Sequence, residues 1–248
     1  FRGIAEAARS LASISHEPHP AYADPLELPA PAPAVDDLGY VATRTLLDDA
    51  GVPFPAMAVV RSEDELLAAL GSGEPRFPVV LKAMGLLHKS DAGGVLLDLR
   101  DESAALAAYR DLVSRLDPPA VTVEEMADLA SGVEVIVGVQ QDPRFGPVAM
   151  VGLGGVLTEV LGDVAFALAP VTPATARELL GSLRGGAVLG GVRGRPPVDL
   201  DALADVVAAV SRAAAVHPEL AELEVNPVLA GPDGCVALDA RAVAGPSD

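Results

Sequence analysis

The spacing of apolar residues changes repeatedly along the chain between the period of a helix and that of a strand. Five segments carry apolar residues at every third or fourth position, which predicts amphipathic helices over Asp36–Ala50, Ser62–Leu70, Ser103–Leu116, Thr172–Leu183 and Leu200–Val216. The pair Thr172-Pro173 is typical of a helix start, and Gly51 follows the end of the first helix.

Short apolar runs between these helices predict strands over Ala56–Val60, Pro78–Ala83, Val95–Leu99, Val121–Met126, Val133–Gln140, Val148–Gly152, Leu220–Leu229 and Cys235–Ala240. Turn residues at Asp142-Pro143 and over Gly231–Gly234 predict that neighbouring strands pair as hairpins. Because the strands follow hairpins as often as helices, the order predicts an α+β fold with antiparallel sheets.

The first 34 residues have a different pattern. Residues 1–15 have helical spacing and are interpreted as the tail of a preceding domain, since the chain begins at Phe1 rather than at methionine. Residues 16–34 are rich in proline and poor in large apolar residues, which predicts an extended linker. The folded unit is therefore expected over residues 35–245.

The composition excludes several classes of partner. With 17 basic and 35 acidic residues the formal charge is −18, which disfavours nucleic acid and anionic membranes as partners. Half of the residues are hydrophobic, so the chain can build a large core. The single cysteine, Cys235, excludes a disulfide framework, and no segment is long and apolar enough for a transmembrane helix. We expect a cytoplasmic protein.

Lysine is confined to one short segment. Lys82 and Lys89 are the only lysines among the 17 basic residues, and all the others are arginine. Lysine places a compact charge on a flexible stem, which suits a phosphoryl oxygen. Chance placement of two surface lysines is the alternative. Lys82 ends an apolar strand, which favours the functional interpretation.

The segment after Lys82 combines a histidine, Lys89 and a glycine pair. Gly93 and Gly94 can turn successive backbone N–H groups toward an anion, so we expect a loop that cradles phosphate. His88 is the most reactive group there, because an imidazole can accept a phosphoryl group. An exposed histidine without a function is the alternative.

Oxygen-bearing residues gather near the C-terminus. Glu224 and Asn226 alternate along a predicted strand, and the following hairpin is expected to bring Asp239 beside them. Such oxygen ligands suit Mg²⁺ when substrate phosphates complete its coordination. Acidic residues on an exposed strand face are the alternative.

Two further segments are candidates for nucleotide contacts. Glu124, Glu125 and Met126 end a predicted strand whose backbone could hydrogen-bond an adenine, and Glu134 could hold ribose hydroxyls. Solvated carboxylates are the simpler alternative. Arg193 and Arg195 lie in a glycine-rich loop that could meet phosphate or a partner domain.

Taken in order, these motifs resemble the ATP-grasp domain of NDP-forming acyl-CoA synthetases, in the succinyl-CoA synthetase superfamily, and specifically its β-subunit or β-like form. The resemblance covers roughly Asp36–Val243, with the motifs FPVVLKAMGLLHKSDAGGV, VEEM, GVEVIVGV, DPRFGPVAMVGLGGVLTEVLGDVAF, GGVRGRPP, ELEVNPV and LDAR. It implies an ATP-grasp fold with nucleotide between two α+β lobes, at about residues 35–120 and 121–245.

The resemblance also implies roles for individual residues. Lys82 would contact the ATP phosphates, and His88 would assist phosphoryl relay. Asn226 and Asp239 would hold Mg²⁺. Adenine-linker and ribose positions would fall on Glu124, Glu125 and Glu134. Lys82, Lys89, Arg193 and Arg195 would make the cleft locally positive despite the acidic surface.

The implied activity is that of an ADP-forming acid–thiol ligase. Acyl-CoA, ADP and phosphate would interconvert with acid, CoA and ATP through a phosphohistidine on a CoA-ligase part. No segment matches that part, so CoA-binding and CoA-ligase domains, in the same or a separate chain, are expected partners, and an oligomer is considered. The alternative is a regulatory ATP-grasp-like domain of a protein acetyltransferase, which senses nucleotide or acyl-CoA without turnover. The sequence leaves both open.

Overall fold

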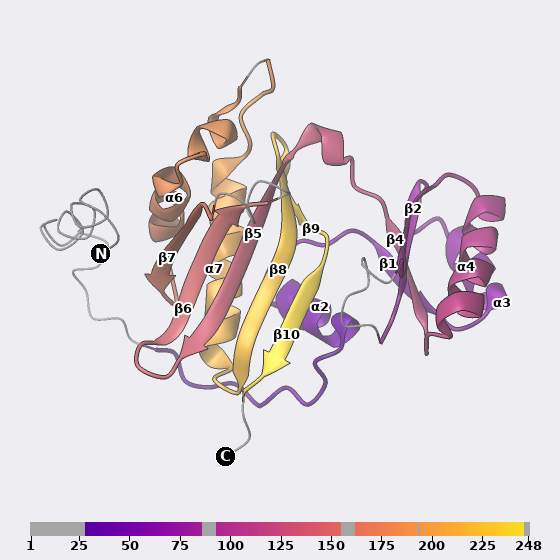
Figure 1. Ribbon diagram of the computed structural model, residues 1–248, viewed down its shortest axis with the longest axis horizontal. Helices are drawn as coiled ribbons and strands as arrows, with labels where there is room; N and C mark the ends of the chain where they lie inside the picture. The colour runs from indigo at the N-terminus through magenta and orange to yellow at the C-terminus, as the bar shows by residue number, and fades with distance from the viewer. Residues whose placement is uncertain (1–27, 86–92, 155–161, 193, 246–248) are drawn as a thin grey trace, which may run out of the picture.

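The structure is a computed structural model that describes residues 28–85, 93–154, 162–192 and 194–245. The tail expected over residues 1–15, and the linker up to residue 27, lie outside the described residues. Residues 28–34 have no regular secondary structure, in keeping with the proline-rich sequence. The described chain forms two lobes, each built on its own sheet (Figure 1). No helix among these residues is both long and apolar enough to cross a bilayer.

The smaller lobe is a four-stranded antiparallel sheet in the order β1-β4-β2-β3, with two helices packed on one face (Figure 1). Its elements are β1 (Met57–Val60), α3 (Glu63–Gly71), β2 (Val79–Ala83), β3 (Val95–Leu99), α4 (Glu102–Leu116) and β4 (Val121–Glu125). The side chains of Ser62 and Asp101 accept hydrogen bonds from first-turn N–H groups of α3 and α4, which fixes where both helices begin.

The larger lobe is an antiparallel sheet in the order β10-β8-β5-β6-β7, and β9 pairs with the end of β8. Its strands are β5 (Val133–Asp142), β6 (Gly146–Leu153), β7 (Val164–Leu168), β8 (Leu220–Gly231), β9 (Gly234–Ala237) and β10 (Ala240–Ala244). Its helical elements are α2 (Tyr40–Asp49), α6 (Pro173–Ser182), η3 (Gly186–Gly190) and α7 (Leu200–Val216).

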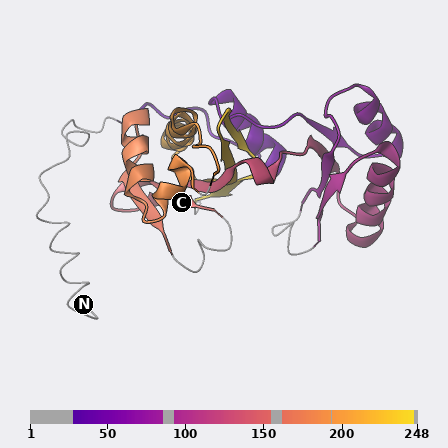
Figure 2. The ribbon, with the colours of Figure 1, turned by 90° about the horizontal axis from the view of Figure 1, so that it is seen from above.

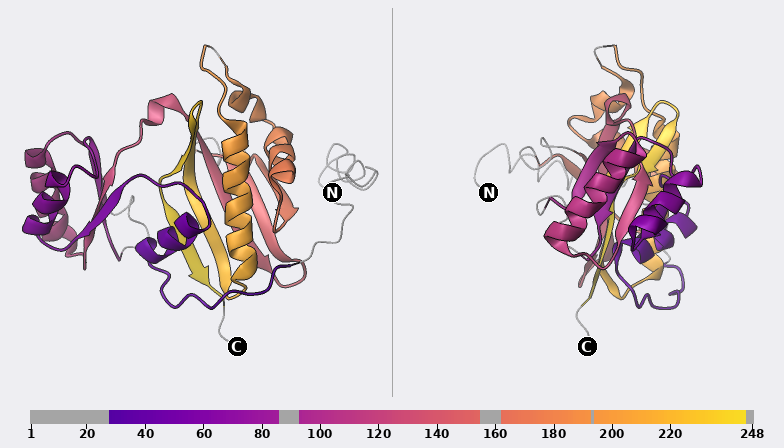
Figure 3. Two further views of the ribbon diagram at one scale, coloured as in Figure 1. Left: turned by 180° about the vertical axis from the view of Figure 1, so that it is seen from behind. Right: turned by 90° about the vertical axis from the view of Figure 1, so that its right-hand side faces the viewer.

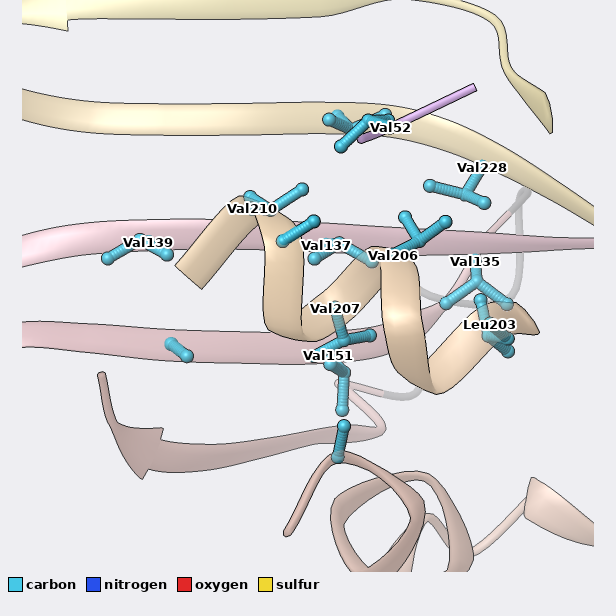
Figure 4. Packing of buried hydrophobic residues seen from close by; sticks show 14 of the residues in the cluster. Val52, Val135, Val137, Val139, Val151, Leu203, Val206, Val207, Val210 and Val228 are labelled. Atoms are coloured by element: carbon cyan, nitrogen blue, oxygen red, sulfur yellow. The ribbon is translucent and has the colours of Figure 1, made fainter. Parts of the chain in front are cut away.

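Helix α7 lies on one face of the larger sheet and packs its apolar face into the core of that lobe (Figure 3, left). Leu203, Val206 and Val207 face the inward side chains of β5, among them Val135 and Val137 (Figure 4). These residues recur at the spacing of a helix on α7 and at every second position on β5, so each element presents one apolar face to the other.

The two lobes are joined twice. The chain crosses from α2 to β1 and returns from β4 through η2 (Leu129–Ser131) to β5, as the view from above shows (Figure 2). Helix α2 precedes β1 but packs with the larger lobe, where Leu47 and Val52 belong to the core. The cleft between the sheets is therefore bordered by segments from distant parts of the sequence.

Several expectations need correction. The first helix begins at Tyr40 rather than Asp36, because the Asp37 carboxylate accepts the Gly39 N–H in a turn that precedes the helix. β4 pairs with β1 and β2, so the small lobe extends past the expected boundary near residue 120. The last segment forms two strands, β9 and β10, that are interrupted at Leu238 and Asp239.

The edge strand β7 was not expected from the sequence. Its residues are Val, Ala, Phe, Ala and Leu, in which small alanines weaken the alternation of large apolar and polar side chains that marks a strand. Pairing with β6 stabilises it. The other elements predicted within the described ranges are present, with ends that differ by a few residues.

Candidate functional site

A cavity of about 240 Å³ lies between the lobes and is lined by residues from both sheets. The small lobe contributes β2, β3 and the end of β4, and the large lobe contributes the start of β5, the middle of β8 and the segment before β10. Among the residues expected to form a site, the cavity brings together Lys82, Glu124, Glu125, Met126, Glu134, Asn226 and Asp239.

Lys82 points from the small lobe toward the large one. On β2, Val79 and Leu81 belong to the small-lobe core, so the alternation of a strand turns Lys82 to the cavity face. Its Nζ donates to Glu124 Oε2 (2.9 Å), to the Tyr40 hydroxyl (3.2 Å) and to the carbonyl oxygen of Leu238 (2.6 Å). The ammonium therefore bridges the two lobes.

Glu124 lies on β4 opposite Val80, two residues along the strand from the position opposite Lys82, and is 2% exposed. The Tyr40 hydroxyl donates to its Oε2 (3.1 Å) and the Thr122 hydroxyl to its Oε1 (2.8 Å). Burial, and next the negative charges of Glu124 and Asp239, raise the pKa of the Tyr40 phenol, so this hydroxyl remains a donor. The sequence suggested a nucleotide contact for Glu124, whereas its carboxylate here pairs with Lys82.

Arg44 is a second cation beside Glu124. Its Nη1 lies 3.5 Å from Glu124 Oε2, its Nη2 donates to the carbonyl of Pro55, and the guanidinium lies 5.0 Å from the centroid of the Phe54 ring. Both Tyr40 and Arg44 come from α2, a helix that the sequence analysis did not connect with the site. The only sequence signal was a basic and an aromatic residue one helical turn apart.

Asn226 and Asp239 lie side by side at the large-lobe wall of the cavity. The Asn226 N–H donates to the carbonyl of Asp239 (3.1 Å), where the edge strands β9 and β10 are interrupted. β8 carries a register shift against β5 at this point, so Asn226 and Pro227 lie in an irregular part of the strand. The expected proximity of these two residues is therefore observed.

A carboxylate and an amide oxygen at one cavity wall suit a hard divalent cation such as Mg²⁺. Among the described residues, no group of three or more His, Cys, Asp and Glu side chains is arranged to hold a metal ion. A cation at this wall would therefore need ligands from outside the protein, such as phosphate oxygens and water.

Glu224 lies in a separate groove on the open face of the larger sheet, with Glu222, Gln140 and Met150. It does not line the cavity that contains Asn226 and Asp239. Burial, and more weakly Glu222, raise the pKa of Glu224 above its ordinary value, while a hydrogen bond with Asn226 acts in the opposite direction. The folded state therefore holds the proton of this carboxyl more tightly than the unfolded chain does.

The raised pKa of Glu224 predicts a pH-dependent effect of its replacement. Because the folded state holds this proton more tightly than the unfolded chain, the stability that Glu224 contributes falls as pH rises from its ordinary pKa through the raised one. Glu224→Gln replaces the carboxyl with a neutral amide that does not titrate. Urea unfolding at about pH 4 and about pH 8 should show the variant gaining stability relative to the wild type at the higher pH. An unchanged difference would contradict the raised pKa.

The end of β4 and the start of β5 provide the remaining cavity wall. The Met126 N–H donates to the carbonyl of Pro78 (2.9 Å), and Glu125 Oε2 pairs with Arg76 at 3.3 Å on the outer side. Glu134 lines the cavity, and its carbonyl accepts the Gly154 N–H (2.6 Å). A Cβ at Gly154 would lie 2.7 Å from Glu134 Cβ, so only glycine allows this approach.

Other expected site residues lie elsewhere. Gly93 and Gly94 precede β3 and do not line the cavity, although the Gly94 carbonyl accepts the Ala83 N–H next to Lys82. Arg195 is exposed in the segment before α7. His88, Lys89 and Arg193 lie outside the described residues.

Comparisons with known proteins agree with this arrangement. A family model described as an ATP-grasp domain matches residues 34–243. The β subunit of the ADP-forming acetate–CoA ligase I of Pyrococcus furiosus is 39% identical over 202 residues, which cover 78% of this chain and 85% of that subunit. The ADP-forming acetate–CoA ligase I of Archaeoglobus fulgidus is 37% identical over 81% of this chain, but the chain spans only 30% of that protein.

Solved structures show the same similarity. An acetyl-coenzyme A synthetase of Ca. Korarchaeum cryptofilum, in complex with coenzyme A and Ca-AMPCP among its ligands, has a TM-score of 0.79 at 34% identity, covering 84% of this chain and 93% of that chain. Another structure of that synthetase, with coenzyme A and Mg-AMPPCP, has a TM-score of 0.72 at 33% identity, covering 83% of this chain and 92% of that chain.

The two-lobed fold, the cavity that carries a lysine on one wall and oxygen donors on the other, and the match over most of the chain lead to the same assignment. This chain belongs to the ATP-grasp family, as the ATP-grasp part of an ADP-forming acyl-CoA ligase.

Proposed function

We propose that this chain binds Mg-ATP and Mg-ADP in the cavity between its lobes and carries out the nucleotide half of acyl-CoA formation. One observation carries the proposal: Lys82 donates to the carbonyl of Leu238, the residue next to Asp239, so the cation and the oxygen donors meet at one cavity. Phosphoryl transfer depends mainly on positioning and on charge neutralisation, which such a cavity can provide.

In this proposal each wall of the cavity binds a different part of the nucleotide. Lys82 binds phosphate oxygens, while Val80, Leu97, Met126 and Leu129 offer apolar surface to the adenine ring. Glu134, at the start of β5, is the candidate for the ribose hydroxyls. Asn226 and Asp239 would hold Mg²⁺, which supplies charge neutralisation to the phosphates when it is bound.

The complete reaction needs more than this chain. It would interconvert acyl-CoA, ADP and phosphate with acid, CoA and ATP, and would pass the phosphoryl group through a phosphohistidine on a CoA-ligase part. The similarity to a separate β subunit, and to one part of longer single chains, supports CoA-binding and CoA-ligase domains as partners. A nucleotide-sensing role without turnover would appear as binding without phosphoryl transfer to such a partner.

Calorimetric titration of the full chain with Mg-ATP and Mg-ADP tests the proposal. We expect saturable binding of both, together with a structure of the ATP-analogue complex in which the phosphates lie near Lys82 and the metal near Asn226. No affinity for either nucleotide would contradict the proposal, as would phosphates located away from Lys82.

A separate prediction concerns His88, which lies in the HKSDAGG motif. If His88 relays the phosphoryl group, His88→Ala abolishes its transfer from ATP to a CoA-ligase partner, while the affinity for Mg-ATP stays close to that of the wild type. Radiolabel transfer and calorimetry measure the two effects. Loss of nucleotide affinity would instead assign His88 a positioning role, and unchanged transfer would exclude the relay.

A further inference from the structure

Arg44 has a buried guanidinium, although the residue does not line the nucleotide cavity. The residue is 9% exposed, and its Nη1 is buried without a hydrogen-bond partner among the described residues. Contact with Pro55 through Nη2, and with the face of Phe54, fixes the rest of the group. A buried donor without a partner is costly, so such a group calls for an explanation.

Nη1 forms an ion pair with Glu124 Oε2, at 3.5 Å. A charged N–H···O hydrogen bond is about 2.8 Å long, so a movement of the guanidinium by about 0.7 Å would complete it. The same oxygen already accepts hydrogen bonds from Lys82 Nζ (2.9 Å) and from the Tyr40 hydroxyl (3.1 Å). Two cations therefore approach one carboxylate oxygen, and Lys82 is the nearer.

Nucleotide binding would change this balance. Glu124 is buried, so its charge must be compensated. In this structure Lys82 compensates it, yet Lys82 is also the cation proposed to bind the phosphates. When the ammonium turns toward a phosphate, Glu124 loses its closest positive partner, and leaving it unpaired would oppose binding.

We propose that Arg44 is a positioning residue that replaces Lys82 as the ion-pair partner of Glu124 when Lys82 binds the phosphates of a nucleotide. Nη1, which makes no hydrogen bond without nucleotide, then donates to Oε2, and the Tyr40 hydroxyl keeps its hydrogen bond to the same carboxylate. Arg44 therefore lowers the cost of moving Lys82 and raises nucleotide affinity without touching the nucleotide. The inference deepens the proposed function and depends on it.

The test is a double-mutant cycle on Mg-ATP affinity, with Arg44→Gln and Glu124→Gln alone and together in the full chain. We expect Arg44→Gln to weaken binding about tenfold or more, because Glu124 would then be unpaired in the complex. Combined with Glu124→Gln, the same change should cost less than about threefold, because no carboxylate remains to be compensated. Arg44→Lys should recover part of the affinity.

Controls separate this effect from a loss of packing. Arg177→Gln removes an arginine that pairs with Asp201 at the surface, and should leave the affinity unchanged. Urea unfolding without nucleotide reports any general destabilisation. If Arg44→Gln does not fold, Arg44→Lys with and without Glu124→Gln carries the same test, with weakening expected only where the carboxylate is present.

Two outcomes overturn the inference. Equal weakening with and without Glu124→Gln would give Arg44 a merely structural role, and unchanged affinity in Arg44→Gln would exclude the exchange. In both cases the wild type still binds nucleotide, so the proposed function stands. If the wild type bound neither Mg-ATP nor Mg-ADP, both proposals would fail together.

Discussion

Lys82→Ala is expected to weaken Mg-ATP binding by about 100-fold or more, which corresponds to about 2.7 kcal/mol. The ammonium is buried at the cavity wall and would form a charge-assisted bond with phosphate, where little water competes. No other basic side chain lines this cavity among the described residues, so none can replace it. Calorimetric titration measures the loss.

The same substitution should destabilise the fold, because Glu124 would lose its nearest cation. Removing one partner of a buried ion pair typically costs about 3–5 kcal/mol, and the neighbouring Arg44 reduces that cost here. Adding Glu124→Gln to Lys82→Ala removes the unpaired carboxylate. The double variant should therefore recover much of the stability in urea unfolding but none of the nucleotide affinity.

This comparison separates folding from binding. If the double variant regained nucleotide affinity, the loss in Lys82→Ala would reflect structural damage, and Lys82 would have no direct part in phosphate binding. If Lys82→Ala bound Mg-ATP as the wild type does, the proposed position of the phosphates would be wrong.

Asp239→Asn is expected to remove most of the dependence of nucleotide affinity on Mg²⁺. Asp239 supplies the carboxylate next to Asn226 among the described residues of this cavity wall, and a neutral amide binds a hard cation far more weakly. In wild type, Mg²⁺ should tighten ATP binding by about tenfold or more over ATP in EDTA, and in the variant by less than about threefold. The rate of phosphoryl transfer should also be lower in Asp239→Asn than in the wild type.

Two substitutions serve as comparisons. Asp233 lies in the exposed turn between β8 and β9 and does not line the cavity. Asp233→Asn removes the same charge as Asp239→Asn and should leave the Mg²⁺ effect intact. Glu224→Gln reports whether Glu224, which faces the neighbouring groove, contributes to the metal site as the sequence suggested. An Asp239→Asn variant that retains the full Mg²⁺ effect would exclude Asp239 as a ligand.

Much of this protein is determined by local sequence. The apolar spacing of Leu200–Val216 predicts α7 with its observed bounds, and Ser62 and Thr172 cap helices as expected. Helical period, strand alternation and caps depend on residues a few positions apart, so they can be recognised without a tertiary structure. The confinement of lysine to two positions likewise identified Lys82 before its surroundings were known.

The partners of Lys82 were decided only by the tertiary structure. Glu124 and Tyr40 lie 42 residues away in opposite directions along the chain, and Leu238 lies 156 residues away. The register between β2 and β4, the packing of α2 on the larger lobe and the interruption before β10 bring them together. No local pattern encodes these long-range pairings, because each arises where two separately formed surfaces meet. For the same reason the sequence could name the candidate ligand Glu224 but not show that its side chain faces a different groove.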